Sequence, residues 1–346
     1  MTKQQISRLN EKQLRTIYNN IRATHNLVNI QKVCGEDLEI VDTDKYEYIM
    51  TYSFPCQDLS LAGKGKGMSD TSTRSGMLWE VERILQECKD LGELPQILLM
   101  ENVPQIHSQD NLDDFNKWKY RLEELGYKNY FQDLIATDYG IPQTRNRCFM
   151  VSILGDYSYT FPKPIPLKLK LKDMLEENVD EKYYLSNKMI NCFLSESENS
   201  KFPRKERFLQ TFNTTNEKGI AATITTCAGT RATDNFIKIK NATLKGYLEA
   251  TDGDGIDISS RMEYHRGNVQ KGKIQTITAS GGNDRGVVNS DLRIRKLTPR
   301  ETGRLMGVKD EDITNMLKNQ SDSSAYHCFG DSIVVNVLMA IFKELI

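Results

Sequence analysis

The sequence lacks the features that mark secreted, zinc-bound and membrane-spanning proteins. Its seven cysteines are an odd number, widely scattered, without a single Cys-x-x-Cys pair, and only four histidines accompany them. This spacing argues against a disulfide framework or a metal site and indicates a reducing compartment. No apolar run reaches the length of a signal core or a membrane span. We therefore expect a cytoplasmic protein with no bound metal and no membrane contact.

An excess of charge of one sign is also missing. The 46 basic and 47 acidic residues leave a formal net charge of −1, so no global basic field points to a nucleic-acid partner. Any surface that binds nucleic acid must be local. At 346 residues, 38% of them hydrophobic, the chain is long enough for one large domain or two ordinary ones.

The opening residues contain no Gly-x-Gly turn after a strand, the feature by which doubly wound nucleotide-binding folds usually admit a cofactor. Residues 3–24 instead place apolar side chains at helical spacing among charged and amide residues. This pattern predicts an amphipathic helix that covers another part of the protein.

One reactive residue stands out at the end of a predicted strand. The apolar run Tyr46-Glu-Tyr-Ile-Met50 leads into Thr51-Tyr-Ser-Phe-Pro-Cys56, which predicts a buried strand that ends in a tight loop. Open α/β sheets carry their chemistry at this edge, and a cysteine there can act as a nucleophile when its thiolate is stabilised. A buried structural thiol is the alternative for Cys56.

The next segment repeats the pattern of a strand followed by a reactive residue. The loop at 62–76 is rich in glycine and hydroxyl residues, and its Lys64, Lys66 and Arg74 could meet phosphates or simply face solvent. A helix is predicted over 77–91 and a strand over 95–100, which ends at Glu101. A right-handed crossover between parallel strands would bring the Cys56 and Glu101 loops to one edge of the sheet.

A second pair of strands brackets a loop with two arginines. Residues 113–126 predict a helix that Gly126 ends, 127–136 a strand, and 148–154 another strand. Between the strands stand Gln143, Arg145 and Arg147. Arginines two positions apart at the start of a strand share a face, as a clamp for an anion or a carbonyl group requires. A surface arginine pair is the alternative.

These separate signals resemble one family, the DNA cytosine carbon-5 methyltransferases. The motifs that carry the resemblance occur in the family's order: Pro55-Cys56-Gln57, Glu101-Asn102-Val103, Gln143-x-Arg145-x-Arg147, Arg295 to Gly307, and Gly330 to Leu338. The resemblance implies an α/β fold. It consists of a doubly wound, Rossmann-like sheet of the type that uses S-adenosylmethionine, truncated at its amino terminus, with a smaller β-rich target recognition domain.

The resemblance also implies a mechanism. The Cys56 thiolate would add to carbon-6 of a flipped-out cytosine, which makes carbon-5 nucleophilic enough to take the methyl group. Glu101 would hydrogen-bond or protonate ring nitrogen-3, and Arg147, supported by Arg145, would hold the exocyclic oxygen. The loop at 62–76 would close over the base. The implied setting is a restriction-modification or phage self-protection system.

The middle of the chain differs in composition from its first part. The proline-punctuated stretch 159–172 indicates a domain boundary, and two loosely similar segments, 219–231 and 273–285, suggest hairpins of a β-rich domain. We expect a catalytic domain over 1–155, a recognition domain over 156–290 and a return to the catalytic domain over 291–346. Residues expected to contact double-stranded DNA are Lys64, Lys66, Arg74, Gln143, Arg231 and Arg285, with Arg261, Arg266 and Asn283 as further candidates.

The carboxyl-terminal part carries helix signals and the remaining cofactor residues that the resemblance implies. Thr298 and Pro299 predict a capped helix start, and 333–345 an apolar helix, which in the family packs beside the amino-terminal half. The cofactor-binding set implied by the resemblance is Asn29, Ile30, Ser53, Pro55, Met77, Asp331, Ser332 and Ile333.

The main departure from the family lies at the front. Members begin with a strand that ends in a Phe-x-Gly-x-Gly-type loop, and residues 1–30 resemble the part that follows it. We therefore expect a methyltransferase whose front is supplied by a separate polypeptide or was lost through misplaced gene boundaries. The alternatives are a catalytically silent DNA-binding fragment, or an unrelated cysteine hydrolase, for which no histidine stands in a recognisable context.

Overall fold

The structure is a computed structural model, and its described residues form two compact units. It describes residues 6–54, 77–184, 210–212, 236–240, 247–257, 268–278, 285–288 and 294–346. The first unit comprises Met1–Asp133 with Arg147–Tyr159, and the second Leu134–Asn146 with Thr160–Ile346. Residues 134–146 and the carboxyl-terminal helices thus belong to the second unit together with 160–290, whereas the expected segments were 1–155, 156–290 and 291–346.

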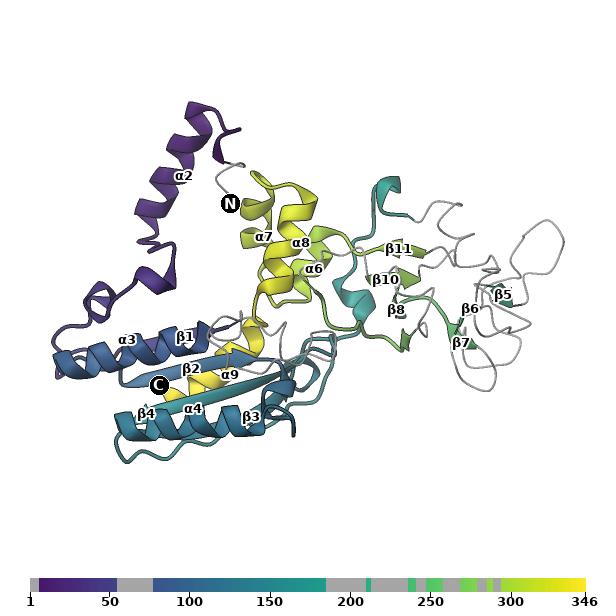
Figure 1. Cartoon of the computed structure of the whole chain (residues 1–346). Helices are drawn as coiled ribbons and strands as arrows, with labels where there is room; N and C mark the ends of the chain where they lie inside the picture. The colour runs from purple at the N-terminus through teal and green to yellow at the C-terminus, as the bar shows by residue number, and fades with distance from the viewer. Residues whose placement is uncertain are drawn as a thin grey trace. The chain divides into compact units, whose positions relative to one another are not determined.

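The first unit is built on a four-stranded mixed sheet. Its strands are β1 (Ile49–Ser53), β2 (Ile97–Asn102), β4 (Asn146–Leu154) and β3 (Tyr127–Ile135), in that spatial order (Figure 1). β1 and β2 are parallel and joined through α3 (Leu78–Leu91), whereas β2 and β4 are antiparallel. The predicted crossover is thus confirmed, and Ser53 stands opposite Glu101 at the carboxyl ends of both strands.

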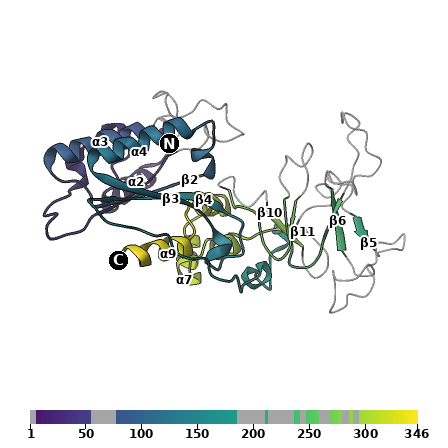
Figure 2. The ribbon, with the colours of Figure 1, turned by 90° about the horizontal axis from the view of Figure 1, so that it is seen from below.

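Two helices cover one face of this sheet. α3 and α4 (Leu112–Leu125) lie side by side on it (Figure 2). Trp118 of α4 donates a hydrogen bond to the hydroxyl of Tyr52 on β1 over 3.0 Å, and burial raises the pKa of that hydroxyl. As predicted, α4 stops at Gly126, whose φ of 101° suits glycine. The shared core contains Leu78, Val81, Leu85, Leu98, Met100, Phe115, Leu122, Cys148 and Met150.

The amino-terminal helix is real but shorter than predicted. α2 spans Glu11–Ala23, and Asn10 caps it through a capping box with Gln13. None of its residues is buried among the described residues, so no described element covers its apolar face. The expectation that it packs on another part of the protein is not met there.

The middle of the second unit contains short strands, as the hairpins expected there require. One sheet orders β11 (Ile294–Lys296), β10 (Arg285–Val288), β8 (Gly255–Asp257) and β9 (Val269–Gln270). Another orders β5 (Gln210–Phe212), β6 (Phe236–Lys240) and β7 (Tyr247–Ala250). Ile274, Ile277, Val287, Leu297 and Leu305 are buried together and form the core beside the first of these sheets.

Four helices follow the strands in the second unit. They are α6 (Pro299–Arg304), α7 (Asp310–Leu317), α8 (Asp322–Asp331) and α9 (Val335–Leu345). The predicted cap is confirmed, because Thr298 accepts a hydrogen bond from the Glu301 amide. The described stretch Asp322–Leu345 has the length and apolar character of a membrane span. It nevertheless consists of two helices, broken where Ser332 is extended.

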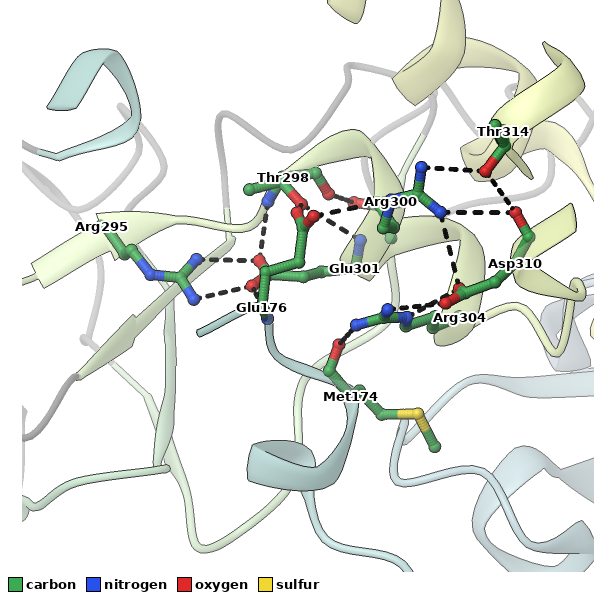
Figure 3. A network of polar contacts seen from close by, with 10 residues as sticks. Met174, Glu176, Arg295, Thr298, Arg300, Glu301, Arg304, Asp310 and Thr314 are labelled. Atoms are coloured by element: carbon green, nitrogen blue, oxygen red, sulfur yellow. Dashed lines mark hydrogen bonds and ion pairs between the residues drawn. The ribbon is translucent and has the colours of Figure 1, made fainter. Parts of the chain in front are cut away.

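A polar network joins residues 174–176 to α6 and to the end of β11 (Figure 3). The fully buried Glu301 carboxylate pairs with both terminal nitrogens of Arg295, at 2.7 and 2.8 Å. It also accepts the backbone N–H groups of Glu176 and Thr298, both at 2.8 Å. Arg304 pairs with Asp310 closer to solvent and donates to the Met174 carbonyl. Glu301 is therefore the centre of four hydrogen bonds.

Candidate active site

An ion pair marks the edge of the first unit's sheet where β1 and β2 end. Arg147 Nε lies 3.0 Å from Glu101 Oε1, and the Ser53 hydroxyl donates to Oε2 over 3.3 Å. The strand register explains the meeting: Glu101 stands opposite Phe149, and Arg147, two residues earlier on β4, shares that face. Both charged side chains are largely buried, with 12% and 19% of their surface exposed. Two of the expected catalytic residues therefore meet at this edge as an ion pair, and their catalytic roles stay predictions.

The next residue, Asn102, binds the end of the described segment that precedes Cys56 in the sequence. Its side-chain amide donates to the Phe54 carbonyl over 3.1 Å, and its side-chain oxygen accepts the Val103 N–H over 2.8 Å. Sequence analysis gave Asn102 no role of its own. The available signal was an amide placed directly after Glu101 at the end of a buried strand, where a polar side chain needs a partner.

Several predicted site residues lie outside the described residues. These are Pro55, Cys56, Lys64, Lys66, Arg74 and Arg231, with the further candidates Arg261, Arg266 and Asn283. Cys56 follows Ser53, the last residue of β1, by three residues in the sequence.

Gln143 and Arg145 make contacts in the structure that differ from those predicted. We predicted a DNA contact for Gln143, but its side chain is 0% exposed. It donates to the Leu305 carbonyl over 2.7 Å and accepts the Ile277 N–H over 3.0 Å. Backbone hydrogen bonds of Thr144 and Pro142 with Ile274 explain the burial, because they draw the loop into the second unit. A DNA contact by Gln143 is therefore not available in this conformation.

Arg145 binds backbone carbonyls. Its terminal nitrogens donate to Ile277 over 2.8 Å, to Gly330 over 3.2 Å and to Ser332 over 2.8 Å. We predicted that it supports Arg147 at the reaction centre. The contacts make it instead the residue that fixes Gly330 and Ser332, which frame the predicted cofactor residue Asp331.

Arg285, predicted to meet DNA, is also engaged inside the second unit. Its Nε donates to the Thr276 carbonyl over 2.9 Å, and a terminal nitrogen lies 3.4 Å from Asp257. Only 13% of its side chain is exposed, because β10 and β8 are paired at this point. These contacts differ from the predicted role and make Arg285 a stabiliser of the small sheet.

Two predicted cofactor residues form a turn that α3 holds in place. Asn29 caps the short turn Ile30–Lys32 by accepting the Gln31 N–H, and Ile30 packs against the core. Arg83 of α3 donates to the carbonyls of Ile30 and Val33, over 3.1 and 2.8 Å. Sequence analysis did not identify Arg83, because its partners stand about fifty residues earlier in the chain.

The remaining cofactor candidates occupy element ends. Met77 directly precedes α3 in the first unit. In the second unit, Asp331 is the last residue of α8 and pairs with His327 at 2.8 Å, while Ser332 and Ile333 lead toward α9.

The comparisons with known proteins agree with the ordered motifs. The family described as C-5 cytosine-specific DNA methylase matches residues 2–346, and the chain belongs to this family. It is 33% identical over 300 residues to the type II methyltransferase M2.ScrFI of Lactococcus lactis subsp. cremoris. It is 30% identical over 344 residues to the orphan methyltransferase M.SssI of Spiroplasma monobiae. The matches cover 85% and 98% of this chain, and 65% and 75% of those proteins.

Solved structures show the same fold. The chain matches an Entamoeba histolytica methyltransferase, EhMeth, with a TM-score of 0.53 and 17% identity, and the S. pombe Dnmt2 methyltransferase with 0.51 and 18%. Each match covers 92% of this chain, and 83% and 82% of those chains. The expected α/β methyltransferase fold is thereby confirmed, and its sheet is mixed.

Proposed function

We propose that this protein transfers a methyl group from S-adenosylmethionine to carbon-5 of a cytosine flipped out of double-stranded DNA, in the bacterial cytoplasm. Membership of the family supports DNA cytosine methylation in general. The Glu101 and Arg147 pair at the sheet edge where β1 ends, three residues before Cys56 in the sequence, is the observation that carries the finer proposal. Restriction-modification or phage self-protection is the proposed setting, since relatives are named type II methyltransferases.

In this proposal the chain's own residues work on the cytosine ring. The Cys56 thiolate forms a bond to carbon-6, and the electrons move toward nitrogen-3, where Glu101 shares or donates a proton. Arg147 holds Glu101 in place and faces the exocyclic oxygen. After carbon-5 has gained the methyl group and a base has taken its proton, the bond from sulfur to carbon-6 breaks and Cys56 is restored.

The proposal assigns described residues of each unit to the cofactor. S-adenosylmethionine supplies the electrophilic methyl group. In the first unit, Ile30 and Trp79 each pack half-buried against the core and are of the apolar kind that a purine ring contacts. In the second unit, Arg145 fixes the carbonyls on both sides of Asp331. A separate polypeptide that completes the pocket stays a prediction, which neither the fold nor the relatives test.

The decisive experiment follows tritium from S-adenosylmethionine into duplex DNA. We expect transfer by the chain, alone or together with an amino-terminal segment from a complete relative, and a loss of at least about 10³-fold in Cys56→Ser, because the nucleophile is removed. Cys34→Ser, which changes an exposed cysteine, is the control. Transfer by Cys56→Ser at the rate of the control would contradict the assigned nucleophile. No transfer in either arm, with DNA binding retained, would favour a DNA-binding fragment.

A second test concerns the turn that holds Asn29 and Ile30. Arg83→Ala is expected to raise the KM for S-adenosylmethionine roughly tenfold with little change in kcat, because two carbonyls lose a charged donor. Arg121→Ala is the matched control. Like Arg83, Arg121 pairs with two glutamates, but none of its described contacts involves this turn. Equal KM values for the two variants would show that Arg83 does not position the cofactor turn.

A further inference from the structure

A second cluster of reactive side chains lies in the first unit and takes no part in the proposed reaction. It consists of His107, Asp133 and Cys148. One ligand atom of each, an imidazole nitrogen, a carboxylate oxygen and the thiol sulfur, lies within 4.8 Å of the other two. His107 Nε2 and Asp133 Oδ1 are 2.9 Å apart. The cluster therefore brings three different metal-ligating groups to one point.

The cluster is on the face of the sheet opposite to Glu101 and Arg147. Cys148 stands opposite Asn102 and packs in the core beneath α3 and α4. Side chains of neighbouring strand residues point to opposite faces, so Cys148 and Arg147 point away from each other. The cluster and the reaction centre thus share strand β4 but not a face of the sheet, and each can be altered separately.

Regular elements position all three side chains. Cys148 is on β4, Asp133 is on the neighbouring β3, and His107 ends the short 3₁₀ turn Pro104–His107 that follows β2. The aromatic rings of Phe131 and Phe115 flank the His107 ring at 5.7 and 6.3 Å between centroids. Sites on packed strands hold their geometry better than sites on loops. The spacing is therefore set by the backbone.

The donor set suits one class of ion. Imidazole nitrogen, carboxylate oxygen and thiolate sulfur bind zinc at about 2.0–2.3 Å, which places ligand atoms of a tetrahedral site about 3.3–3.7 Å apart. The trio reaches that spacing with side-chain shifts of about 1 Å. A thiolate and an imidazole favour zinc, cobalt or copper over magnesium or calcium, whose ligands are oxygen atoms. A water molecule can fill a fourth position, as in open zinc sites.

Metal binding at this cluster exchanges a proton for the ion. A divalent ion that binds there takes a lone pair of the Cys148 sulfur, and the thiol proton that it displaces goes to solvent. Asp133 and His107 donate lone pairs of an oxygen and a ring nitrogen to the same ion. No electron transfer is needed.

We propose that His107, Asp133 and Cys148 bind one zinc-class divalent ion. The bound ion ties β3 and β4 to the turn that follows β2. It thereby stabilises, from the opposite face of the sheet, the arrangement of β2 and β4, the strands that carry Glu101 and Arg147. The sequence alone led us to expect no metal, since its cysteines are unpaired.

Cobalt titration of the metal-free full chain tests the proposal. One Co²⁺ per chain is expected to produce a thiolate-to-cobalt absorption band that Zn²⁺ abolishes by competition. The band is expected to be lost in Cys148→Ser and His107→Gln. It is expected to persist in Cys34→Ser and His327→Gln, which alter an exposed pair of Cys34 with Asp37 and an exposed pair of His327 with Asp331. These controls present the same chemical groups without the third ligand.

Thermal unfolding gives a second readout. Zn²⁺ is expected to raise the Tm of the wild-type chain by about 3 °C or more and to leave His107→Gln unchanged. If Cys148→Ser fails to fold, Asp133→Asn and His107→Gln carry the test, since about a third of each of those side chains is exposed. Absence of the cobalt band in the wild type, or its persistence in His107→Gln, would overturn the proposal. Neither readout involves DNA or methyl transfer, so the proposed function is tested separately.

Discussion

Replacing Glu101 with Gln is expected to lower kcat for cytosine methylation by about 10²–10⁴-fold and to change the Kd for DNA by no more than about twofold. Glutamine keeps the size of the side chain and can still accept a hydrogen bond. It cannot share or donate a carboxyl proton to ring nitrogen-3 as negative charge develops there. The loss should therefore fall on the chemical step.

Release of tritium from DNA labelled at carbon-5 of cytosine measures that step directly, because each completed methylation expels the proton at this position. Glu124→Gln is the matched control, since Glu124 also pairs with an arginine, Arg121, but at the surface of α4. The Trp79 and Trp118 side chains both lie in the first unit, so their fluorescence during urea unfolding shows whether Glu101→Gln still folds. A folded Glu101→Gln as active as Glu124→Gln would remove Glu101 from the mechanism.

The sequence could predict that Glu101 lies at the sheet edge where the preceding strand also ends, because both strand ends follow from local rules. Each strand end follows an apolar run, and parallel strands joined by a helix present their carboxyl ends at one edge. The pairing of Ser53 on β1 with Glu101 on β2 agrees with this rule. Local patterns thus sufficed where the partners share a sheet.

Local patterns did not suffice where burial depends on distant segments. Gln143 stands in a loop with charged neighbours and looked like a surface residue, but its partners Ile277 and Leu305 are 134 and 162 residues away. His107, Asp133 and Cys148 are likewise separated in sequence, so their cluster shows no spacing motif. The helix predicted near the amino terminus has the expected period, yet periodicity could not tell which surface covers it.

The largest stability effect is expected at the buried ion pair of the second unit. Glu301→Gln should lower the free energy of unfolding of that unit by about 3–5 kcal/mol, because Arg295 is left as a buried charge without its partner. Only 3% of the Arg295 side chain is exposed, so water cannot replace the lost carboxylate. Asp310→Asn breaks the pair with Arg304 nearby, where 53% of the Asp310 side chain is exposed, and should cost about 1 kcal/mol or less.

Comparison of two spectroscopic signals in urea tests this expectation within one sample. Far-ultraviolet circular dichroism follows both units, whereas tryptophan fluorescence follows the first unit alone. Glu301→Gln should shift the dichroism transition to lower urea and move the fluorescence transition less. Adding Arg295→Met should restore part of the loss, since it removes the unpaired charge, and Asp310→Asn sets the scale of an exposed pair. A Glu301→Gln transition indistinguishable from that of Asp310→Asn would mean that the four hydrogen bonds at Glu301 do not hold the second unit together.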